Sequence, residues 1–336
     1  MSPTTRAVHV KAPWQVEVRD VAIQPIKPGW IRIQVEACGI CGTDQTAAQT
    51  APQWEALGHE VAGIVSELGP EVTSLTVGQR VVLESASFCG QCDLCRDGRV
   101  DLCNTKAPNF WGQNAMGMSD QFLVPAVCAV PYEGLAPEHA CAVEPCGVAY
   151  DLVKSAEIEM GDRVLVIGPG PIGLAAAALA RHRGAARLVV LGTRDDGRLA
   201  VARKIGAETV VHDGDFGTLT SLHRQFDRVL NTAPANTIAP ALAFLNYGGI
   251  QAFIGIGVGD DTVTFSGNDF HFRKLQLRSS FASPAIYYPA VLRLMAAGII
   301  PVADLVTQVM PLSRAPEAFA LLRERRETAL KVVLKP

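Results

Sequence analysis

Four cysteines within fifteen residues form the densest group of metal-binding side chains in the sequence. They follow the pattern Cys89-x2-Cys92-x2-Cys95-x7-Cys103. Four soft, anionic thiolates that leave no open coordination position are typical of a closed, tetrahedral structural zinc site. An iron–sulfur cluster is the alternative, because similar cysteine spacings also hold clusters. We predict structural zinc.

A second group of metal-binding side chains comes from three separated segments: Cys41, the pair His59 and Glu60, and Glu144. A catalytic zinc takes three or four protein ligands of these types from different elements and keeps one position for water or substrate. A single histidine beside a glutamate is more often a structural pair than a metal site. The hypothesis of a catalytic zinc therefore depends on the residues occurring together, ahead of a nucleotide-binding motif.

That motif is a glycine-rich turn between a predicted buried strand and a predicted helix. The β-branched run 164–167 leads into Gly168-Pro-Gly170-Pro171-Ile172-Gly173, and an Ala/Leu-rich segment follows. In such a turn the first glycine permits the bend, the second lets the backbone approach a pyrophosphate, and the third lets helix and strand pack closely. The helix N-terminus favours the anion through its free N–H groups and its dipole. We predict dinucleotide binding by these residues.

The next turn favours NADP(H) over NAD(H). A fold that binds NAD places a carboxylate about 20 residues beyond the last glycine, where it accepts a hydrogen bond from the ribose 2′-hydroxyl. Here the chain reads Leu-Gly-Thr193-Arg194, without a carboxylate. Thr193 can donate a hydrogen bond and Arg194 can pair with a 2′-phosphate. The alternative is that Asp195 or Asp196 binds the 2′-hydroxyl and that Arg194 is a solvated surface charge.

Two patterns of secondary structure must position these motifs. Residues 1–146 contain short β-like runs between Pro/Gly turns, whereas 147–284 alternate strands with helices, which predicts a parallel sheet. Residues 285–336 contain two predicted helices and a strand, and we expect them to return to the first domain. The predicted fold class is α/β, with a β-rich domain (1–146 and 285–336) and a doubly wound Rossmann domain (147–284).

The composition narrows the class of protein. A length of 336 residues, 49% of them hydrophobic and 19% charged, suits two folded domains. A net charge of −3 gives no basic surface for nucleic acid or an anionic membrane. The apolar stretch 164–180 is too short for a bilayer and is interrupted by Pro and Gly. Nine cysteines without a recognisable signal peptide favour a reducing compartment, so we expect a cytoplasmic protein.

Together the motifs resemble the zinc-dependent medium-chain alcohol and polyol dehydrogenases, the group that includes sorbitol and threonine dehydrogenases. The resemblance covers essentially the whole chain and rests on five segments: Cys38-Gly-Ile-Cys-Gly-Thr-Asp44, Leu57-Gly-His-Glu60, the cysteines 89–103, Val143-Glu-Pro145 and the glycines 168–173. It implies a GroES-like β-rich catalytic domain beside the Rossmann domain, with the active site in the cleft between them. It also implies hydride transfer between a nicotinamide cofactor, here predicted to be NADP(H), and a secondary alcohol or ketone, and a homodimer or homotetramer.

The resemblance assigns roles to individual residues. Cys41, His59 and one or both of Glu60 and Glu144 would hold the catalytic zinc, and a glutamate at 144 is similar to the polyol branch of the family. Thr43 would contact the substrate oxygen. Asp44 would orient His59. These features suggest a polyol, a cyclitol or another polar alcohol as substrate.

Three departures from the family pattern affect these expectations. The family often has a proton-relay histidine where this chain has Thr46, so the proton would leave through water, Thr46 or Glu60. The loop between Cys41 and His59 is short, and the segment 116–122 differs from the family pattern. Three aromatic residues could line the substrate site or lie in the core: Trp54, Phe110 and Trp111.

Two other functions remain open from the sequence. A reductase of activated C=C or C=N bonds would use the same nucleotide fold without a catalytic zinc. A protein that binds NADP(H) without turnover would also fit, because the relay histidine is missing. A count of bound zinc separates the first alternative from the dehydrogenase, which should hold two ions per chain.

Overall fold

The computed structural model describes residues 3–103, 107–255, 261–325 and 327–336, which form two compact units. The first unit comprises Met1–Gly147, Ala282–Ala296 and Val306–Pro336, and the second comprises Val148–Phe281 and Ala297–Leu305. The first unit is thus discontinuous in sequence. The short segment 297–305, expected in the first domain, belongs to the second unit.

The first unit is built mainly on antiparallel strands, with one parallel pair, β15 and β16. Its larger sheet has the order β15-β16-β3-β5-β6-β8, with β7 also paired to β3, and its smaller sheet has the order β2-β1-β4. The strands are β1 (Thr4–Lys11), β2 (Gln15–Ala22), β3 (Trp30–Gly39), β4 (Glu55–Ala56), β5 (Glu60–Leu68), β6 (Arg80–Leu83), β7 (Gln121–Pro125), β8 (Ala129–Pro131), β15 (Val306–Pro311) and β16 (Lys331–Lys335). Along β3, Ile31, Ile33 and Val35 alternate with more exposed residues, so one face of the strand packs into the core.

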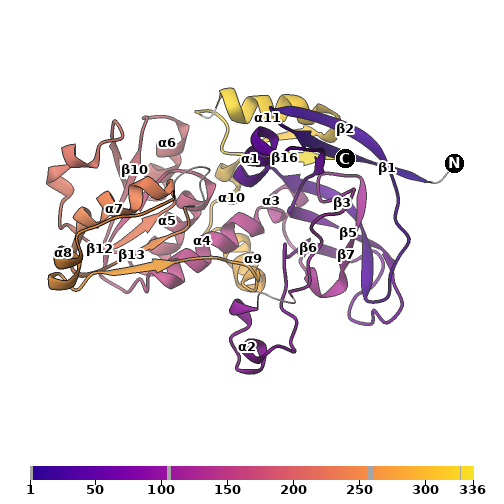
Figure 1. Ribbon diagram of the computed structural model, residues 1–336, viewed down its shortest axis with the longest axis horizontal. Helices are drawn as coiled ribbons and strands as arrows, with labels where there is room; N and C mark the ends of the chain where they lie inside the picture. Colours follow the sequence, from indigo (N-terminus) through magenta and orange to yellow (C-terminus); the bar gives the residue numbers. More distant parts are fainter. Residues whose placement is uncertain (1–2, 104–106, 256–260, 326) are drawn as a thin grey trace. The chain divides into compact units, whose positions relative to one another are not determined.

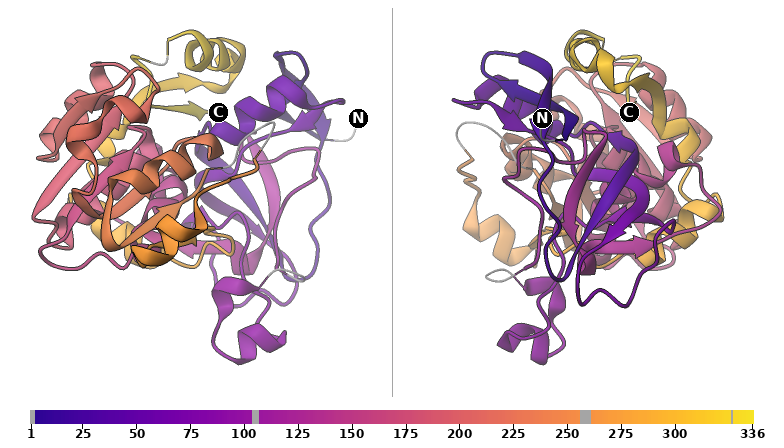
Figure 2. Two further views of the ribbon diagram at one scale, coloured as in Figure 1. Left: turned by 60° about the vertical axis from the view of Figure 1, so that its left-hand side comes forward. Right: turned by 90° about the vertical axis from the view of Figure 1, so that its right-hand side faces the viewer.

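The C-terminal strand β16 lies inside this larger sheet. It pairs in parallel with β15 and antiparallel with β3, through Val333 opposite Gly39 and Leu334 opposite Cys38. Figures 1 and 2 show the C-terminus beside strands from the beginning of the chain. The last strand therefore lies next to the segment that precedes Cys41.

The helices of the first unit are short. They are α1 (Gly42–Thr50), α2 (Asp93–Arg96), α3 (Pro137–Ala140), α9 (Tyr288–Ala296) and α11 (Ala315–Glu324), and α4 (Val143–Ser155) runs from the first unit into the second. The helix α2 lies in a small lobe that extends from the strands of its unit (Figure 1). This lobe carries the four clustered cysteines.

The second unit confirms the predicted doubly wound parallel sheet. Six strands follow the order β11-β10-β9-β12-β13-β14, and all of their pairings are parallel. The strands are β9 (Arg163–Ile167), β10 (Arg187–Gly192), β11 (Glu208–Val211), β12 (Phe226–Asn231), β13 (Leu245–Phe253) and β14 (Gln276–Ser279). The helices are α5 (Pro171–His182), α6 (Gly197–Lys204), α7 (Ile238–Ala241), α8 (Gly267–Phe272) and α10 (Val302–Leu305). The order reverses beside β9, and ligands bind such sheets at the carboxyl ends of the strands flanking the reversal.

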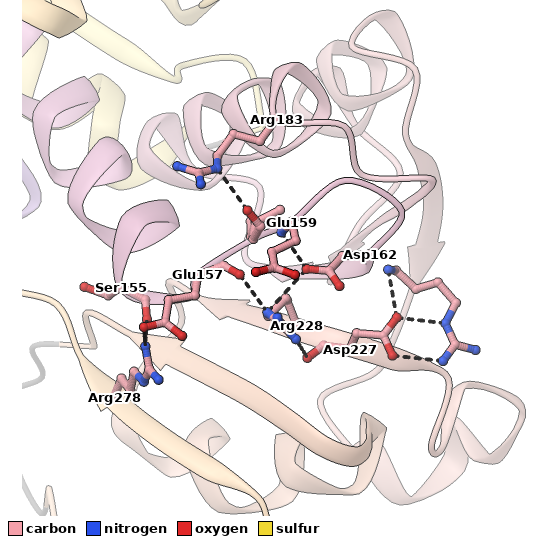
Figure 3. A network of polar contacts seen from close by, with 10 residues as sticks. Ser155, Glu157, Glu159, Asp162, Arg183, Asp227, Arg228 and Arg278 are labelled. Carbon is pink, nitrogen blue, oxygen red and sulfur yellow. Dashed lines mark hydrogen bonds and ion pairs between the residues drawn. The ribbon is translucent and has the colours of Figure 1, made fainter.

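The amino ends of these strands carry a network of ion pairs (Figure 3). Arg163 at the start of β9 donates from two guanidinium nitrogens to the two carboxylate oxygens of Asp227, each at 3.0 Å. Arg228 lies 3.4 Å from Asp162, and Arg278 lies 2.6 Å from Glu157. These charges are paired with one another at the opposite end of the strands from the glycine turn, so we regard this edge as structural.

Within the described ranges, each helix is too short or too polar to cross a lipid bilayer.

Candidate active site

The glycine turn of the second unit is closely packed at two of its glycines and open at the third. Gly168 has φ +96°, and a Cβ there would lie 2.7 Å from Oγ1 of Thr232. A Cβ on Gly173 would lie 2.0 Å from the Gly168 carbonyl oxygen, so the helix packs directly on the turn. A Cβ on Gly170 would meet nothing within 4 Å, and α5 begins immediately after it at Pro171. The open space lies at the N-terminus of a twelve-residue helix, where an anion is stabilised.

The turn after β10 leaves Thr193 and Arg194 exposed. The two acidic residues that follow have other partners. Asp195 forms a 2.9 Å ion pair with Arg203, and Asp196 caps α6 by accepting a 2.9 Å hydrogen bond from the amide of Arg198. A basic side chain is therefore the first charged group after the strand.

The four cysteines of the lobe come together as a group. Their sulfur atoms, from Cys89, Cys92, Cys95 and Cys103, all lie within 4.8 Å of one another. The amides of Gln91 and Cys92 donate hydrogen bonds of 3.4 Å to the Cys89 sulfur, and the Cys89 amide donates one of 3.3 Å to Cys103. The donors on Cys89 lower the pKa of its thiol to about 6. Burial raises the pKa of the Cys95 and Cys103 thiols, so the backbone donors favour the thiolate, the form that binds metal, at Cys89.

Cys41, His59 and Glu60 also come together, although 17 residues separate the first two. One ligand atom from each residue lies within 4.8 Å of the others. The sheet explains this proximity, because Gly39 at the end of β3 pairs with Glu60 at the start of β5. Cys41 follows β3 and His59 precedes β5, so the register of one strand pair brings all three side chains to the same edge.

The carboxylate of Asp44 faces two of these residues, Cys41 and His59. Its Oδ2 accepts a 2.8 Å hydrogen bond from the Cys41 amide, and its Oδ1 lies 3.6 Å from Nδ1 of His59. Burial alone would lower the pKa of His59, but the charges of Asp44, Cys41 and Glu144 raise it well above its usual value. With Nδ1 facing a carboxylate, the Nε2 atom of His59 is left for a ligand on the other side.

Glu144 lies on α4 and is partly buried. Its charge acts on His59, so it belongs to the same neighbourhood, but it is outside the group of three within 4.8 Å. Desolvation raises the pKa of Glu144 to about 7, and His59 opposes that shift. The ring of Tyr288 packs against the same helix, since a Cβ on Gly147 would lie 3.3 Å from its Cε1 atom, and its buried hydroxyl has no hydrogen-bond partner among the described residues.

Lys331 is a buried charged residue beside the cluster that the sequence motifs did not single out. It is 4% exposed, and its Nζ lies 2.5 Å from Oε1 of Glu60. The motifs did not single out Gly39 either. It must be a glycine, because a Cβ there would lie 2.0 Å from Oε2 of Glu60. The signal for Lys331 was its position: a lysine inside the apolar run 329–334 needs a buried partner.

The three aromatic residues have different environments. Phe110 is 1% exposed and belongs to the core of the first unit, and Trp54 packs under the guanidinium of Arg19. Trp111 is 50% exposed, and its ring centroid lies 5.1 Å from that of His59. Trp111 therefore offers a free aromatic surface directly beside the cluster.

The hydroxyl groups near Cys41 also differ. Thr43 is exposed, whereas the Thr46 hydroxyl donates a 3.2 Å hydrogen bond to the carbonyl of Gly42 within α1. In the segment 116–122, the amides of Gly117 and Met118 donate to the carbonyls of Gly58 and Leu57, at 3.0 and 2.9 Å. That segment thus supports the turn that carries His59.

Comparison with known proteins identifies the family. The alcohol dehydrogenase GroES-like domain matches residues 27–136, and the zinc-binding dehydrogenase domain matches residues 171–297. A sorbitol dehydrogenase from Arabidopsis thaliana is 33% identical over 279 residues, which cover 75% of each chain. An L-arabinitol 4-dehydrogenase from Hypocrea jecorina is 30% identical over 329 residues, which cover 92% of this chain and 86% of that protein.

A solved structure extends the similarity to the whole fold. A zinc-binding dehydrogenase from Sinorhizobium meliloti 1021 bound to NADP has a TM-score of 0.88 and 27% identity, and 100% of both chains is covered. The predicted combination of a GroES-like domain and a Rossmann domain is therefore confirmed. With a relative 33% identical over three quarters of its length, the chain belongs to the zinc-dependent medium-chain alcohol and polyol dehydrogenases and is an oxidoreductase of that family.

Proposed function

We propose that this protein interconverts a polar secondary alcohol, of the polyol or cyclitol type, and the corresponding ketone with NADP(H). The observation that carries the proposal is the group formed by Cys41, His59 and Glu60, with Asp44 behind it. Thiolate, imidazole and carboxylate ligands are the combination that a catalytic zinc takes.

The site fits a cation for a second reason. Oε2 of Glu60 is buried and has no hydrogen-bond partner among the described residues. A buried carboxylate oxygen without a partner costs free energy, and the charge of a metal ion in the group would reduce that cost. Cys41 and His59 would hold the ion together with Glu60, Glu144 or both. These residues would hold a zinc ion whose chemistry there would be that of a Lewis acid toward an alcohol or carbonyl oxygen, and the glycine turn would hold the NADP(H) needed for hydride transfer.

The residues around the cluster have separate tasks in this proposal. Asp44 accepts a hydrogen bond from the Cys41 amide, and its second oxygen faces Nδ1 of His59 at 3.6 Å, which would favour the ligand orientation of both residues. Thr43 is exposed next to Cys41 and would accept the alcohol proton. Because the Thr46 hydroxyl already donates to Gly42, we assign the next step of proton transfer to water.

The substrate class is supported by relatives and by one residue. The two curated relatives named above act, by their names, on sorbitol and L-arabinitol. Trp111 offers a half-exposed ring beside His59, and the C–H groups of a polyol chain can pack against such a ring while its hydroxyls remain hydrated.

NADP(H) is supported by the turn after β10. Arg194 is exposed there, whereas Asp195 is paired with Arg203 and Asp196 caps α6. These engagements disfavour the alternative in which either aspartate binds the 2′-hydroxyl. The Sinorhizobium meliloti relative was solved with NADP. We also assign a second, structural zinc to the four-cysteine lobe, whose unpaired thiols suit a reducing compartment such as the cytoplasm.

We further propose that two copies pair through the edge strand β14. This strand ends the parallel sheet, and large aromatic side chains flank it: Tyr247, Phe272 and Phe281 are 63%, 73% and 71% exposed. An unpaired edge with exposed aromatics is suited to pairing with the same edge of another copy. Light scattering should give the mass of a dimer or a tetramer.

An NADP(H)-coupled screen of polyols, cyclitols and ketones, with a zinc count, tests the main proposal. We expect two zinc ions per chain and turnover of a polyol or cyclitol. One ion per chain, with reduction of activated C=C or C=N bonds, would establish the competing reductase. A more than tenfold preference for NAD(H) would reject the cofactor assignment while leaving the chemistry intact.

A further inference from the structure

Lys331 and Glu60 form an ion pair in the interior of the first unit. Their side chains are 5% and 0% exposed, with 2.5 Å between Nζ and Oε1. The same ammonium donates a 2.9 Å hydrogen bond to the carbonyl of Ile40, the residue before Cys41. Lys331 therefore connects β16 to both segments that carry the proposed metal ligands.

The two oxygens of the Glu60 carboxylate have different environments. Oε1 is bound to Lys331, whereas Oε2 has no hydrogen-bond partner in the described part of the chain. The carboxylate also has little freedom on the side of β3, because a Cβ on Gly39 would lie only 2.0 Å from Oε2. The position of this carboxylate is thus determined by β3 and by Lys331.

Stability is a poor explanation for such a pair. The desolvation of two buried charges cancels much of their attraction, and apolar replacements of similar volume are often as stable. The coordination chemistry offers a better explanation. Three protein ligands leave an open position on a zinc ion, whereas four close the site. If Glu144 is the third ligand beside Cys41 and His59, an unrestrained Glu60, whose carboxylate oxygen lies within 4.8 Å of the other two ligand atoms, would supply the fourth.

We infer that Lys331 is a positioning residue that holds the Glu60 carboxylate on β16 and so keeps one coordination position open for the substrate. The inference rests on the catalytic zinc proposed above. The ammonium competes with the metal for the carboxylate because it is a fixed positive charge at hydrogen-bond distance from Oε1. Without this charge, the metal would be the nearest positive charge available to Glu60.

The test compares Lys331→Met with the parent enzyme loaded with zinc or with cobalt. The visible absorption of cobalt reports the ligand set and geometry, and the unchanged four-cysteine lobe cancels in difference spectra. In Lys331→Met we expect a changed cobalt spectrum and a release of the catalytic metal to a chelator that is slowed by roughly tenfold. We also expect kcat to fall by at least roughly tenfold, since loss of one partner of a buried pair is a large perturbation.

The decisive comparison repeats the Lys331→Met substitution in a protein that already carries Glu60→Gln. Glu60→Gln/Lys331→Met removes both charges, so it leaves no buried unpaired ion and should fold even if Lys331→Met does not. If Lys331 acts through Glu60, adding Lys331→Met to Glu60→Gln should change the spectrum and the release rate by no more than about twofold. Lys335→Met is the matched control, because Lys335 lies on the same strand and pairs instead with Glu138 at 3.3 Å.

The outcomes separate the inference from the proposed function. If Lys331→Met had the same cobalt spectrum and the same rate of metal release as the parent enzyme, the inference would be overturned. Faster metal release, equal in both backgrounds, would also overturn it, because Lys331 would then only support the Ile40 carbonyl. If the parent enzyme binds metal in the four-cysteine lobe alone and shows no turnover, the proposed function itself fails.

Discussion

Alanine at Gly173 should destabilise the second unit, whereas alanine at Gly170 should impair cofactor binding alone. The two glycines are three residues apart in one turn, but an added methyl group meets different surroundings. At 173 it would lie 2.0 Å from the Gly168 carbonyl oxygen and 3.1 Å from Oγ1 of Thr232. At 170 it would meet no protein atom within 4 Å, and φ −77° with ψ 176° suits any residue.

The expected magnitudes follow from these distances. Relief of the contact at 173 needs a backbone shift on the order of 1 Å, which places the cost near the upper end of the roughly 1–3 kcal/mol found for overpacking. The better helix propensity of alanine returns about 1 kcal/mol. The free energy of unfolding of the second unit should thus fall by about 2 kcal/mol, or roughly 5 °C in Tm. At 170, alanine is a poorer N-cap than glycine, which destabilises the folded state, but it also restricts the unfolded chain, which stabilises the folded state. The two effects on the free energy of unfolding should nearly cancel.

Calorimetry and an NADPH fluorescence titration measure both effects. Gly170→Ala should keep the parent Tm within about 2 °C, but its methyl group would occupy the space of the pyrophosphate. We expect its Kd for NADPH to rise by at least roughly tenfold, equivalent to about 1.4 kcal/mol. If Gly170→Ala lowered the Tm as much as Gly173→Ala did, or bound NADPH like the parent, the assignment of the turn would be refuted.

Three further predictions concern charge and metal. Arg194→Ala should lower kcat/KM for NADPH by about tenfold through loss of a charged hydrogen bond, and an equal loss with NADH would remove Arg194 from the 2′-phosphate site. Cys41→Ser should reduce the zinc count by one and abolish turnover at a nearly unchanged Tm, whereas Cys92→Ser should lower the Tm; full activity in Cys41→Ser would contradict the metal assignment. Burial raises the pKa of Glu84 from 4.5 to about 7, so the folded state loses stability as pH rises between these values. Glu84→Gln should therefore stabilise the protein by up to about 3 kcal/mol at pH 8 and have little effect near pH 4, as urea midpoints at both pH values would show.

The parts of the structure that the sequence predicted are those whose chemistry is local. The glycine turn and the four cysteines each occupy one short segment, so the spacing alone defines the group that they form. Cys41 and His59 are separated, but each carries a recognisable motif. Their proximity then follows from the pairing of β3 with β5.

The parts that the sequence could not predict depend on register between distant strands. The partner of Glu60 is Lys331, 271 residues further along the chain, and no local pattern specifies that β16 pairs with β3 at Gly39. Phe110 and Trp111 show the same limit at short range. They are adjacent aromatic residues, but one is 1% exposed and the other 50%. The irregular loop that carries them has no period from which these directions could be inferred.

The late position of β16 also has a consequence for biosynthesis. While a ribosome is translating the second unit, the edge of β3 next to Cys38 and Gly39 has no neighbour, because the strand that will cover it has not been made. The nucleotide-binding unit is almost continuous in sequence and can fold on emergence, but the metal-binding unit must wait with an open sheet edge and an unpaired Glu60. Nascent chains of this protein should therefore depend on chaperones in the interval before β16 leaves the exit tunnel.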